Sequence, residues 1–379
     1  MKKIPLHSLI LLIDDHFSNI NLDFKDHEVL SLSKISNQIY GLEKINDLVE
    51  ARYYDLIETK IKYGERVIID GTNLNYRIRE KITYYGKKYR IPIFYLISKE
   101  ETLHDKQILN GDNRAEIIKL FENQEIRIVH KNQINLKYLT NNGYAGLTII
   151  PDVHNMSNSL KNAVEWAKQR KHYIIQLGDL IDYGPNPLEC IDVMYDLITR
   201  GHASAIIGNH EKKVIRYFTN ETNDRIRLSN ANKTTIDAIN SLHYDLKRVY
   251  VSKLLTINNL SHNILNIENL YFTHGAIHPS FWINQTLTRE ILEYAYYGEV
   301  EANREQVTRI YNWVNDIPKD QIVIVGHDIR STSLPINIDN TNNGKAIFLD
   351  TGSGKSGTLT TLDLPIRKNK IEFGNFNRY

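Results

Sequence analysis

Apolar and polar positions follow two kinds of pattern along the 379-residue chain. In the first 143 residues, short apolar runs at 8–13, 65–70 and 91–97 alternate with longer amphipathic stretches at 45–62 and 76–89. The short runs predict buried strands and the long stretches predict helices, because a helical pattern needs roughly ten residues or more. Strands that alternate with helices in this way indicate a parallel α/β layer.

A cluster of turn residues, Thr140-Asn141-Asn142-Gly143, precedes a second series of short apolar runs. Each run of this series ends in polar residues, and we expect the strands to be buried on both faces. The predicted strands are 147–150, 173–177, 203–207, 270–272, 322–325, 346–349 and 358–364, with a helix over 158–171. We therefore predict two domains, residues 1–143 and residues 144–379.

The composition excludes several classes of protein. Apolar residues make up 41% of the chain and charged residues 24%, which is the balance of a soluble globular protein. The formal net charge of +2 gives no evidence for a nucleic-acid, membrane or acidic partner. The single cysteine, Cys190, excludes an intramolecular disulfide and a thiolate metal site. No stretch reaches the roughly 18 apolar residues of a membrane span, so we expect a cytoplasmic protein without a membrane partner.

Polar residues follow five of the predicted strands of the second part. In open α/β sheets the functional site lies outside the carboxyl ends of the strands, where these residues fall. Carboxylate, imidazole and amide groups together suit a divalent metal ion. One such cluster arises often by chance, whereas five in this order are typical of a metal site. The clusters are Asp152-Val153-His154, Gly178-Asp179-Leu180-Ile181-Asp182, Gly208-Asn209-His210-Glu211, His274-Gly275 and Gly326-His327-Asp328.

The spacing of these residues predicts two metal ions. Asp152 and His154 are two residues apart, so on an extended chain both side chains leave the same face and can chelate one ion. The two oxygens of Asp179 can bridge to a second ion. Two ions about 3.5–4 Å apart would hold phosphoryl oxygens and activate a shared water. Three further side chains could complete the second position: Asn209, His274 and His327.

This arrangement resembles the calcineurin-like metallophosphoesterase family over nearly all of residues 147–364. The resemblance implies a β-sandwich flanked by helices, with two divalent ions, manganese first and nickel, iron or zinc as alternatives. It implies that His210 protonates the leaving oxygen and that Asp182 orients His210. It also implies two ligand sets that share one carboxylate: Asp152, His154 and Asp179 for one ion, and Asp179, Asn209, His274 and His327 for the other.

The chain departs from the family pattern at two positions. Tyr183 stands where many relatives have an arginine that grips substrate phosphate, and Ile329 stands where some have a further histidine ligand. Separately, residues 352–356 resemble the end of a P-loop, but the first glycine of that motif and the helix that follows it are both missing. We interpret this segment as a glycine turn near the metal site, with Lys355 and Tyr183 as candidate substrate contacts.

A closer resemblance is to the phosphatase domain of bacterial polynucleotide kinase-phosphatase. It rests on the stretches 178–185, 190–194, 296–299, 311–314 and 349–352, the first of which diadenosine tetraphosphate hydrolases share. The resemblance implies that Asp350 and Arg289 lie near the site as substrate contacts. A turn carboxylate and a solvated helix charge are equally good interpretations of these two residues.

The first domain resembles a P-loop kinase that has lost its active residues. Residues 67–73 are similar to the kinase strand that ends in Asp-x-Thr-Asn, but residues 13–19 lack the glycine and lysine of a phosphate-binding loop. Ser33 stands at the place of the acceptor base, and Arg114 is the lone candidate lid arginine. We therefore expect a degenerate P-loop kinase-like α/β domain without kinase activity. An unrelated α/β domain is the alternative.

The sequence thus predicts a metal-dependent phosphoesterase. The mechanism would be attack by metal-bound hydroxide, with both ions stabilising the charge on the phosphoryl group. The first expected substrate is a polynucleotide end with a 3′-phosphate or 2′,3′-cyclic phosphate, and nucleotides are the other expected partners. Three alternatives stay open: a diadenosine tetraphosphatase, a serine/threonine protein phosphatase and a nucleic-acid-binding pseudoenzyme. The sequence gives no oligomeric state.

Overall fold

The described residues of the computed structural model form two compact units, Met1–Lys131 with Ile239–Asn259, and Asn132–Ala238 with Leu260–Tyr379. The predicted domain boundary after residue 143 lies shortly beyond the change of unit at Lys131 and stays a prediction. No helix within the described ranges is long and apolar enough to cross a membrane. These ranges are residues 2–5, 8–13, 28–41, 45–62, 65–71, 74, 76–89, 91–97, 115–119, 126–129, 134–219, 228–302, 307–355 and 357–379.

The first unit contains an open parallel sheet with the strand order β3-β4-β2-β5-β6. Every neighbouring pair of strands in it is parallel, which confirms the predicted α/β layer. A short parallel pair, β1 with β7, lies apart from this sheet. The elements are β1 (Lys2–Pro5), β2 (Leu9–Leu12), β3 (Val29–Leu30), α1 (Leu32–Tyr40), α2 (Asp47–Lys62), β4 (Val67–Asp70), α3 (Tyr76–Lys88), β5 (Ile93–Ile97), β6 (Ala115–Lys119), β7 (Ile126–Val129) and α10 (Tyr244–Leu260).

The resemblance of the first unit to a P-loop kinase rests mostly on residues outside the described ranges. Residues 14–19, Thr72, Asn73 and Arg114 are outside the described residues, so the predicted loss of the phosphate-binding loop is not tested. Ser33 is described: it lies half-buried on α1, and its hydroxyl is 3.3 Å from that of Ser31.

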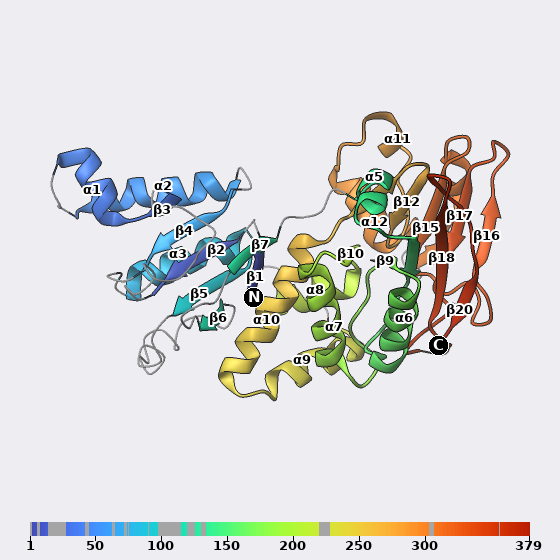
Figure 1. The fold of residues 1–379 in the computed structure, drawn as a ribbon, viewed down its shortest axis with the longest axis horizontal. Coiled ribbons are helices and arrows are strands. Elements are labelled where there is room, and N and C mark those ends of the chain that lie inside the picture. The colour runs from blue at the N-terminus through green and yellow to red at the C-terminus, as the bar shows by residue number, and fades with distance from the viewer. Residues whose placement is uncertain are drawn as a thin grey trace. The chain divides into compact units, whose positions relative to one another are not determined.

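The second unit is a sandwich of two sheets. One sheet has the order β10-β9-β8-β18-β19, with β20 also paired to β18, and the other has the order β11-β12-β15-β17-β16 (Figure 1). Its strands are β8 (Gly146–Ile150), β9 (His172–Gln176), β10 (Ala203–Ala205), β11 (Ile264–Ile267), β12 (Leu270–Thr273), β13 (Val300–Ala302), β14 (Val307–Arg309), β15 (Ile322–Val325), β16 (Ile336–Asp339), β17 (Lys345–Phe348), β18 (Thr360–Arg367), β19 (Lys370–Ile371) and β20 (Phe376–Arg378).

The main core of this unit lies between the two sheets. Ile149 and Leu362 from the first sheet pack in one buried cluster with Phe272 and Ile324 from the second. A second cluster, around Trp313, covers the outer face of the second sheet. Helices α6 and α7 pack outside the first sheet (Figure 1). The helices are α5 (Leu136–Asn141), α6 (Ser157–Gln169), α7 (Pro187–Thr199), α8 (Asn209–Phe218), α9 (Asn230–Asn240), α11 (Phe281–Asn284), α12 (Arg289–Tyr297) and the 3-10 helix η4 (Asn312–Asp316).

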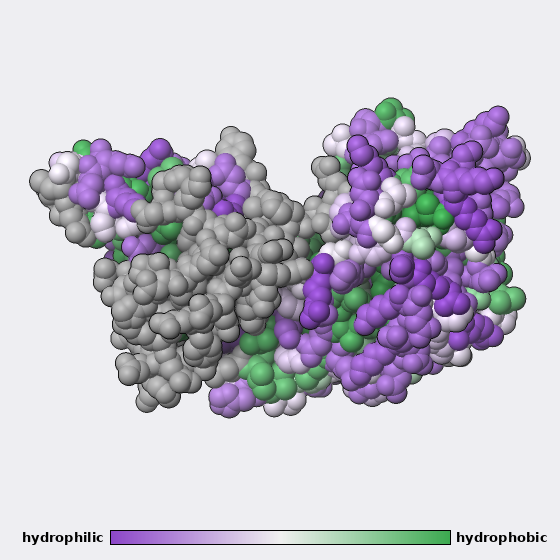
Figure 2. All heavy atoms as spheres, in the orientation of Figure 1, coloured by the Kyte–Doolittle hydropathy of each residue, from purple (hydrophilic) through white to green (hydrophobic). Residues whose placement is uncertain are grey.

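Strand direction brings the carboxyl ends of several strands to a common edge. β8, β9 and β10 are parallel, and so are β12, β15 and β17. The visible outer surface of this unit is mainly hydrophilic, with small apolar patches (Figure 2). All seven strands predicted after residue 143 form, and the predicted helix over 158–171 is α6. The predicted β-sandwich flanked by helices is therefore present.

A buried carboxylate, Asp363 on β18, connects the first sheet to α6. It accepts hydrogen bonds from the Thr148 hydroxyl at 2.8 Å and the Trp166 indole N–H at 2.8 Å. Burial opposes ionisation, but the hydrogen bonds with His172, Trp166 and Thr148 hold the pKa of Asp363 below its ordinary value. The ionised carboxylate therefore stabilises the folded second unit.

We expect Asp363→Ala to lower the free energy of unfolding of this unit by about 3 kcal/mol at neutral pH, because it leaves buried donors without an acceptor. The deficit should shrink as pH falls below about 4, where the unfolded carboxylate protonates and the wild type loses the same contribution. Tryptophan fluorescence in urea reports on this unit. The exposed Asp339→Ala is the matched control, and equal loss in both variants would contradict the prediction.

Candidate metal centre

Most of the predicted site residues lie on loops that leave the carboxyl ends of the strands, whereas Asn209 and His210 begin helix α8 and Arg289 begins α12. Five of them have a left-handed backbone: φ is 49° at His154, 52° at Asp179, 76° at Asp182, 63° at Tyr183 and 63° at His327. Such a conformation costs on the order of 1–3 kcal/mol for a residue with a side chain and clusters at functional sites. The surrounding packing therefore holds these loops in shapes that they would not adopt alone.

Asp152 and His154 converge, but not for the reason that their spacing suggested. β8 ends at Ile150, and the chain then turns at His154 instead of continuing extended. His154 Nε2 lies 3.7 Å from Asp152 Oδ2 and 3.9 Å from Asp179 Oδ2. The predicted extended-chain geometry is wrong, while the three predicted donors of the first ion do lie together.

The second predicted set also converges on Asp179. His274 Nε2 lies 3.3 Å from Asp179 Oδ2 and 3.1 Å from the amide oxygen of Asn209. His327 Nδ1 lies 3.1 Å from the same His274 nitrogen. Asp179, His274 and His327 thus present donor atoms within 4.8 Å of one another, as expected for ligands of a common ion.

Backbone carbonyls fix which nitrogen of two histidines is free. His154 Nδ1 lies 2.9 Å from the carbonyl of Ile181, and His274 Nδ1 lies 2.8 Å from that of Leu177. Because a carbonyl can only accept, each Nδ1 carries a proton and donates it, which leaves Nε2 as the nitrogen that faces the cluster. This partner arrangement is typical of metal-binding histidines.

Orphaned polar atoms test whether these residues fit a metal ion. Asp152 Oδ2 and His154 Nε2 are buried and have no hydrogen-bond partner among the described residues. Burial raises the pKa of Asp152 to about 6, and the neighbouring charge of Asp179 adds to the effect. Buried polar atoms without partners are costly, and a divalent cation would satisfy both. The donor set of carboxylate, imidazole and amide oxygen therefore fits two divalent ions.

His210 lies beside this cluster with a carboxylate behind it. Its Nδ1 donates to Asp182 Oδ2 at 2.6 Å, and its Nε2 lies 3.8 Å from Asp179 Oδ2. Burial opposes the charge on this imidazole, but Asp179 and the hydrogen bond to Asp182 raise the pKa of His210 above its ordinary value. A raised pKa keeps a larger fraction of an imidazole protonated near neutral pH, which favours a role as general acid.

Three supporting residues had no role in the sequence prediction. Glu211 on α8 accepts the backbone N–H groups of Asp179 at 3.0 Å and Leu180 at 2.8 Å, which fixes the loop that carries the shared carboxylate. Asn232 on α9 donates to Asp182, and the Thr235 hydroxyl accepts the backbone N–H of Asp182 at 3.0 Å. Glu211 belongs to the Gly-Asn-His-Glu motif, whereas no sequence signal pointed to α9.

The predicted substrate contacts divide into two groups. Asp350 is buried near Asp152, and Tyr183 and Lys355 lie together beside His154. Burial first, and then the charge of Asp152, hold the pKa of Asp350 well above its ordinary value. Arg289 is 92% exposed at the start of α12, and its described ion pair is with Glu293, so the interpretation as a solvated helix charge fits it better.

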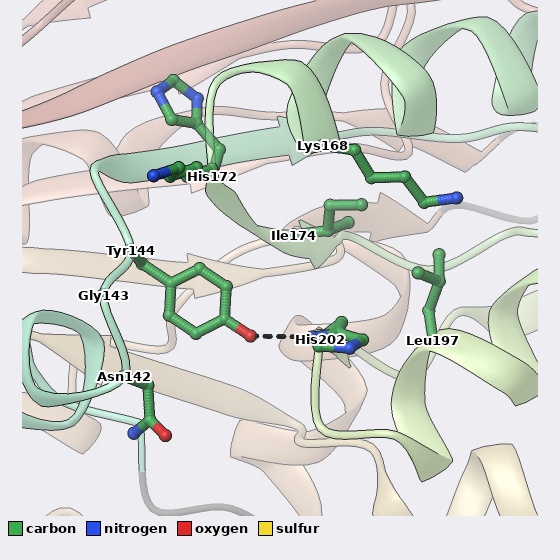
Figure 3. Close-up of a pocket in the computed structure, with 9 residues that line it drawn as sticks. Asn142, Gly143, Tyr144, Lys168, His172, Ile174, Leu197 and His202 are labelled. Carbon is green, nitrogen blue, oxygen red and sulfur yellow. Dashed lines mark hydrogen bonds between the residues drawn. The ribbon is translucent and has the colours of Figure 1, made fainter.

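A cavity of about 420 Å³ opens elsewhere, at the amino ends of β8, β9 and β10 (Figure 3). Tyr144, His172 and His202 are among the residues that line it, and the Tyr144 hydroxyl is 3.0 Å from His202 Nδ1. None of the predicted site residues lines this cavity. The amino ends of parallel strands lie opposite the edge that carries the metal donors, so the cavity has no part in the chemistry described above.

The family model of the calcineurin-like phosphoesterases matches residues 146–346, which is more than half of the chain and contains all six predicted metal ligands. The chain belongs to the calcineurin-like phosphoesterase family. The match covers the strands and loops of the sandwich that carry the site. Members of this family use a dinuclear metal centre. This agrees with two groups of donor atoms that share Asp179, one with His154 and His210 and the other with His274 and His327.

Curated relatives of this phosphoesterase are named bis(5′-nucleosyl)-tetraphosphatase PrpE (asymmetrical). The protein of Bacillus mycoides is 25% identical over 204 residues, which cover 52% of this chain and 77% of the relative. The protein of Halalkalibacterium halodurans is 24% identical over 240 residues, which cover 59% of this chain and 91% of that relative. A solved metallophosphoesterase structure from Sphaerobacter thermophilus is 18% identical and covers 62% of this chain and 88% of its own, with a TM-score of 0.37.

We expect the manganese-loaded phosphoesterase to bind about two metal ions per chain and Asp179→Ala to bind fewer than one, because Asp179 serves both donor groups. Elemental analysis after gel filtration measures the metal content. The exposed Asp339→Ala should keep the wild-type content. Retention of two ions by Asp179→Ala would mean that the shared carboxylate is assigned wrongly.

The pH dependence of turnover should respond to Asp182. His210 must carry a proton to act as an acid, so activity is lost as pH rises through its raised pKa. Asp182→Asn removes a carboxylate that raises this pKa, and we expect the alkaline limb of kcat to move down by about one pH unit or more. Profiles at fixed manganese concentration measure the limb. An unmoved alkaline limb in Asp182→Asn would refute the role of the His210–Asp182 pair.

Proposed function

We propose that this phosphoesterase hydrolyses a phosphate bond in a nucleotide substrate, with a bis(5′-nucleosyl) tetraphosphate as the first candidate. One observation carries the proposal: a buried imidazole–carboxylate pair, His210 with Asp182, lies within reach of a cluster in which Asp179 is common to two metal-donor groups. Hydrolysis of a phosphate bond needs a proton donor for the leaving oxygen beside two metal ions that bind the phosphoryl group. The names of the curated relatives support the dinucleotide.

Each group of the site has a role in this proposal. Asp152, His154 and Asp179 hold one ion, and Asn209, His274 and His327 join Asp179 to hold the other. The two ions would supply an activated water and neutralise charge on the phosphoryl oxygens. We place manganese first, with nickel, iron and zinc as the alternatives.

The proton transfer is assigned to this chain's own residues. His210 donates a proton from Nε2 to the leaving oxygen, while its Nδ1–H stays bonded to Asp182. The Asn232 amide and the Thr235 hydroxyl hold Asp182 in place, so the imidazole keeps its orientation during turnover. Asp350, buried near Asp152, is a proposed contact to substrate or to a bound water.

A second candidate substrate is a polynucleotide end with a 3′-phosphate or a 2′,3′-cyclic phosphate. The first unit supports it, because its open parallel sheet has the first core strand, β2, at the centre, as expected for a nucleotide-binding α/β domain. We propose that this unit is a P-loop kinase-like domain without kinase activity that binds the strand or acts as a scaffold. The proposed compartment is the cytoplasm.

A panel of substrates separates the candidates. We expect the manganese-loaded protein to hydrolyse diadenosine tetraphosphate into two unequal nucleotides, and Asp179→Ala to lose at least about a hundredfold in kcat/KM. The panel adds a 3′-phosphorylated oligonucleotide, a 2′,3′-cyclic one and p-nitrophenyl phosphate, read by chromatography of the products. Turnover of the oligonucleotide ends alone would favour end repair instead. No turnover with manganese, nickel or zinc would refute the proposed function.

A further inference from the structure

Tyr183 covers the imidazoles of the metal centre at the position where many relatives have an arginine. Its ring centroid lies 4.8 Å from that of His154 and 5.5 Å from that of His210, and 43% of the residue is exposed. A phenol carries no positive charge at neutral pH, so Tyr183 cannot itself replace the charge of the arginine.

A cation from a distant part of the chain reaches the same place. The Lys355 ammonium lies 4.8 Å from the centroid of the Tyr183 ring, within the range of a cation–π contact. Lys355 belongs to the turn after β17, more than 170 residues from Tyr183 along the chain. The tertiary fold therefore brings a positive charge close to Tyr183, which stands where the family pattern has an arginine.

The turn that carries Lys355 is fixed against the metal-binding loop. Gly354 has φ of 70°, and a Cβ built there would lie 2.6 Å from the Cβ of His154, so only glycine fits. The Ser353 hydroxyl donates to the carbonyl of Val153 at 3.0 Å, and the Lys355 N–H donates to the carbonyl of Gly352 at 3.0 Å. The segment interpreted from the sequence as a glycine turn near the metal site therefore packs against the His154 loop and holds Lys355 beside Tyr183.

The ammonium of Lys355 has no described carboxylate within ion-pair distance, and its side chain is exposed. Its charge acts on the site: it opposes the rise in the pKa of Asp152 and adds to the fall in the pKa of His327. By contrast, Arg309, which also acts on His327, pairs with Asp328 at 3.4 Å. Among these described cations Lys355 is the one whose charge is available to an anion.

We propose that Lys355, positioned by the ring of Tyr183, binds a phosphate oxygen of the substrate in place of the missing arginine. The inference rests on the proposed function. An ammonium is a point charge on a flexible stem and makes one contact where a guanidinium would make two. Charge, more than geometry, then governs binding, so a dianionic phosphate monoester should depend on Lys355 more than a monoanionic diester does.

The test uses the manganese-loaded full-length protein, with inorganic phosphate as ligand and p-nitrophenyl phosphate and bis(p-nitrophenyl) phosphate as substrates. Lys355→Ala should raise the Kd of phosphate and the KM of the monoester about tenfold, raise the KM of the diester less, and keep two metal ions. Tyr183→Ala should raise the monoester KM, and Tyr183→Phe, which keeps the ring, should raise it less. Lys370→Ala, which removes an exposed lysine from β19, is the control for net charge.

A double variant makes the proposal sharper. Tyr183→Arg combined with Lys355→Ala rebuilds the arginine of the relatives, and it should recover most of the phosphate affinity that Lys355→Ala loses. The proposal is overturned if Lys355→Ala has the phosphate Kd of Lys370→Ala, if it loses metal instead, or if the double variant recovers nothing. If the wild type turns over no substrate but its phosphate Kd still depends on Lys355, the hydrolase function fails and the phosphate contact stands.

Discussion

The phosphoesterase unit is organised around a group of metal donors that are buried away from water. Without a cation, the buried carboxylates among them would repel one another or take up protons. Asp152, Asp179 and Asp350 are all buried within one small region, together with His154 and His274. Carboxylates and imidazoles out of water need partners, and divalent cations supply them for several donors at once. To bring these donors together, the backbone at His154, Asp179 and His327 adopts a left-handed conformation that is unfavourable for residues with a side chain.

The support of the site comes from hydrogen bonds that point inward from neighbouring helices. Glu211 holds the backbone of the Asp179 loop, while Asn232 and Thr235 hold Asp182, which holds His210. Carbonyls of Leu177 and Ile181 decide which nitrogen of His274 and His154 faces the ions. Such partners tune a metal centre nearly as much as the ligands do, because they fix orientation and protonation before substrate arrives.

Much of the fold could be predicted because the strands are short apolar runs with polar ends. β8, β9, β12, β15 and β17 all begin and end within about two residues of the predicted runs, as buried strands with a clear pattern should. The sequence analysis missed β11, β13, β14 and β16, which are short or half exposed. It also predicted no helix after residue 171, and so missed α7, α8, α9, α10 and α12. The formation of those short strands depends on tertiary packing more than on local pattern.

The sequence by itself determined the family, the positions of the main strands along the chain and the chemical types of the metal donors, because motif residues at strand ends are local features. Only the tertiary structure decided how those donors converge: the turn at His154 replaced the extended geometry expected from its spacing. Only the fold brought Lys355 onto Tyr183 and Asn232 onto Asp182. Contacts between residues far apart in the chain depend on loop shapes that packing imposes, and no local pattern encodes them.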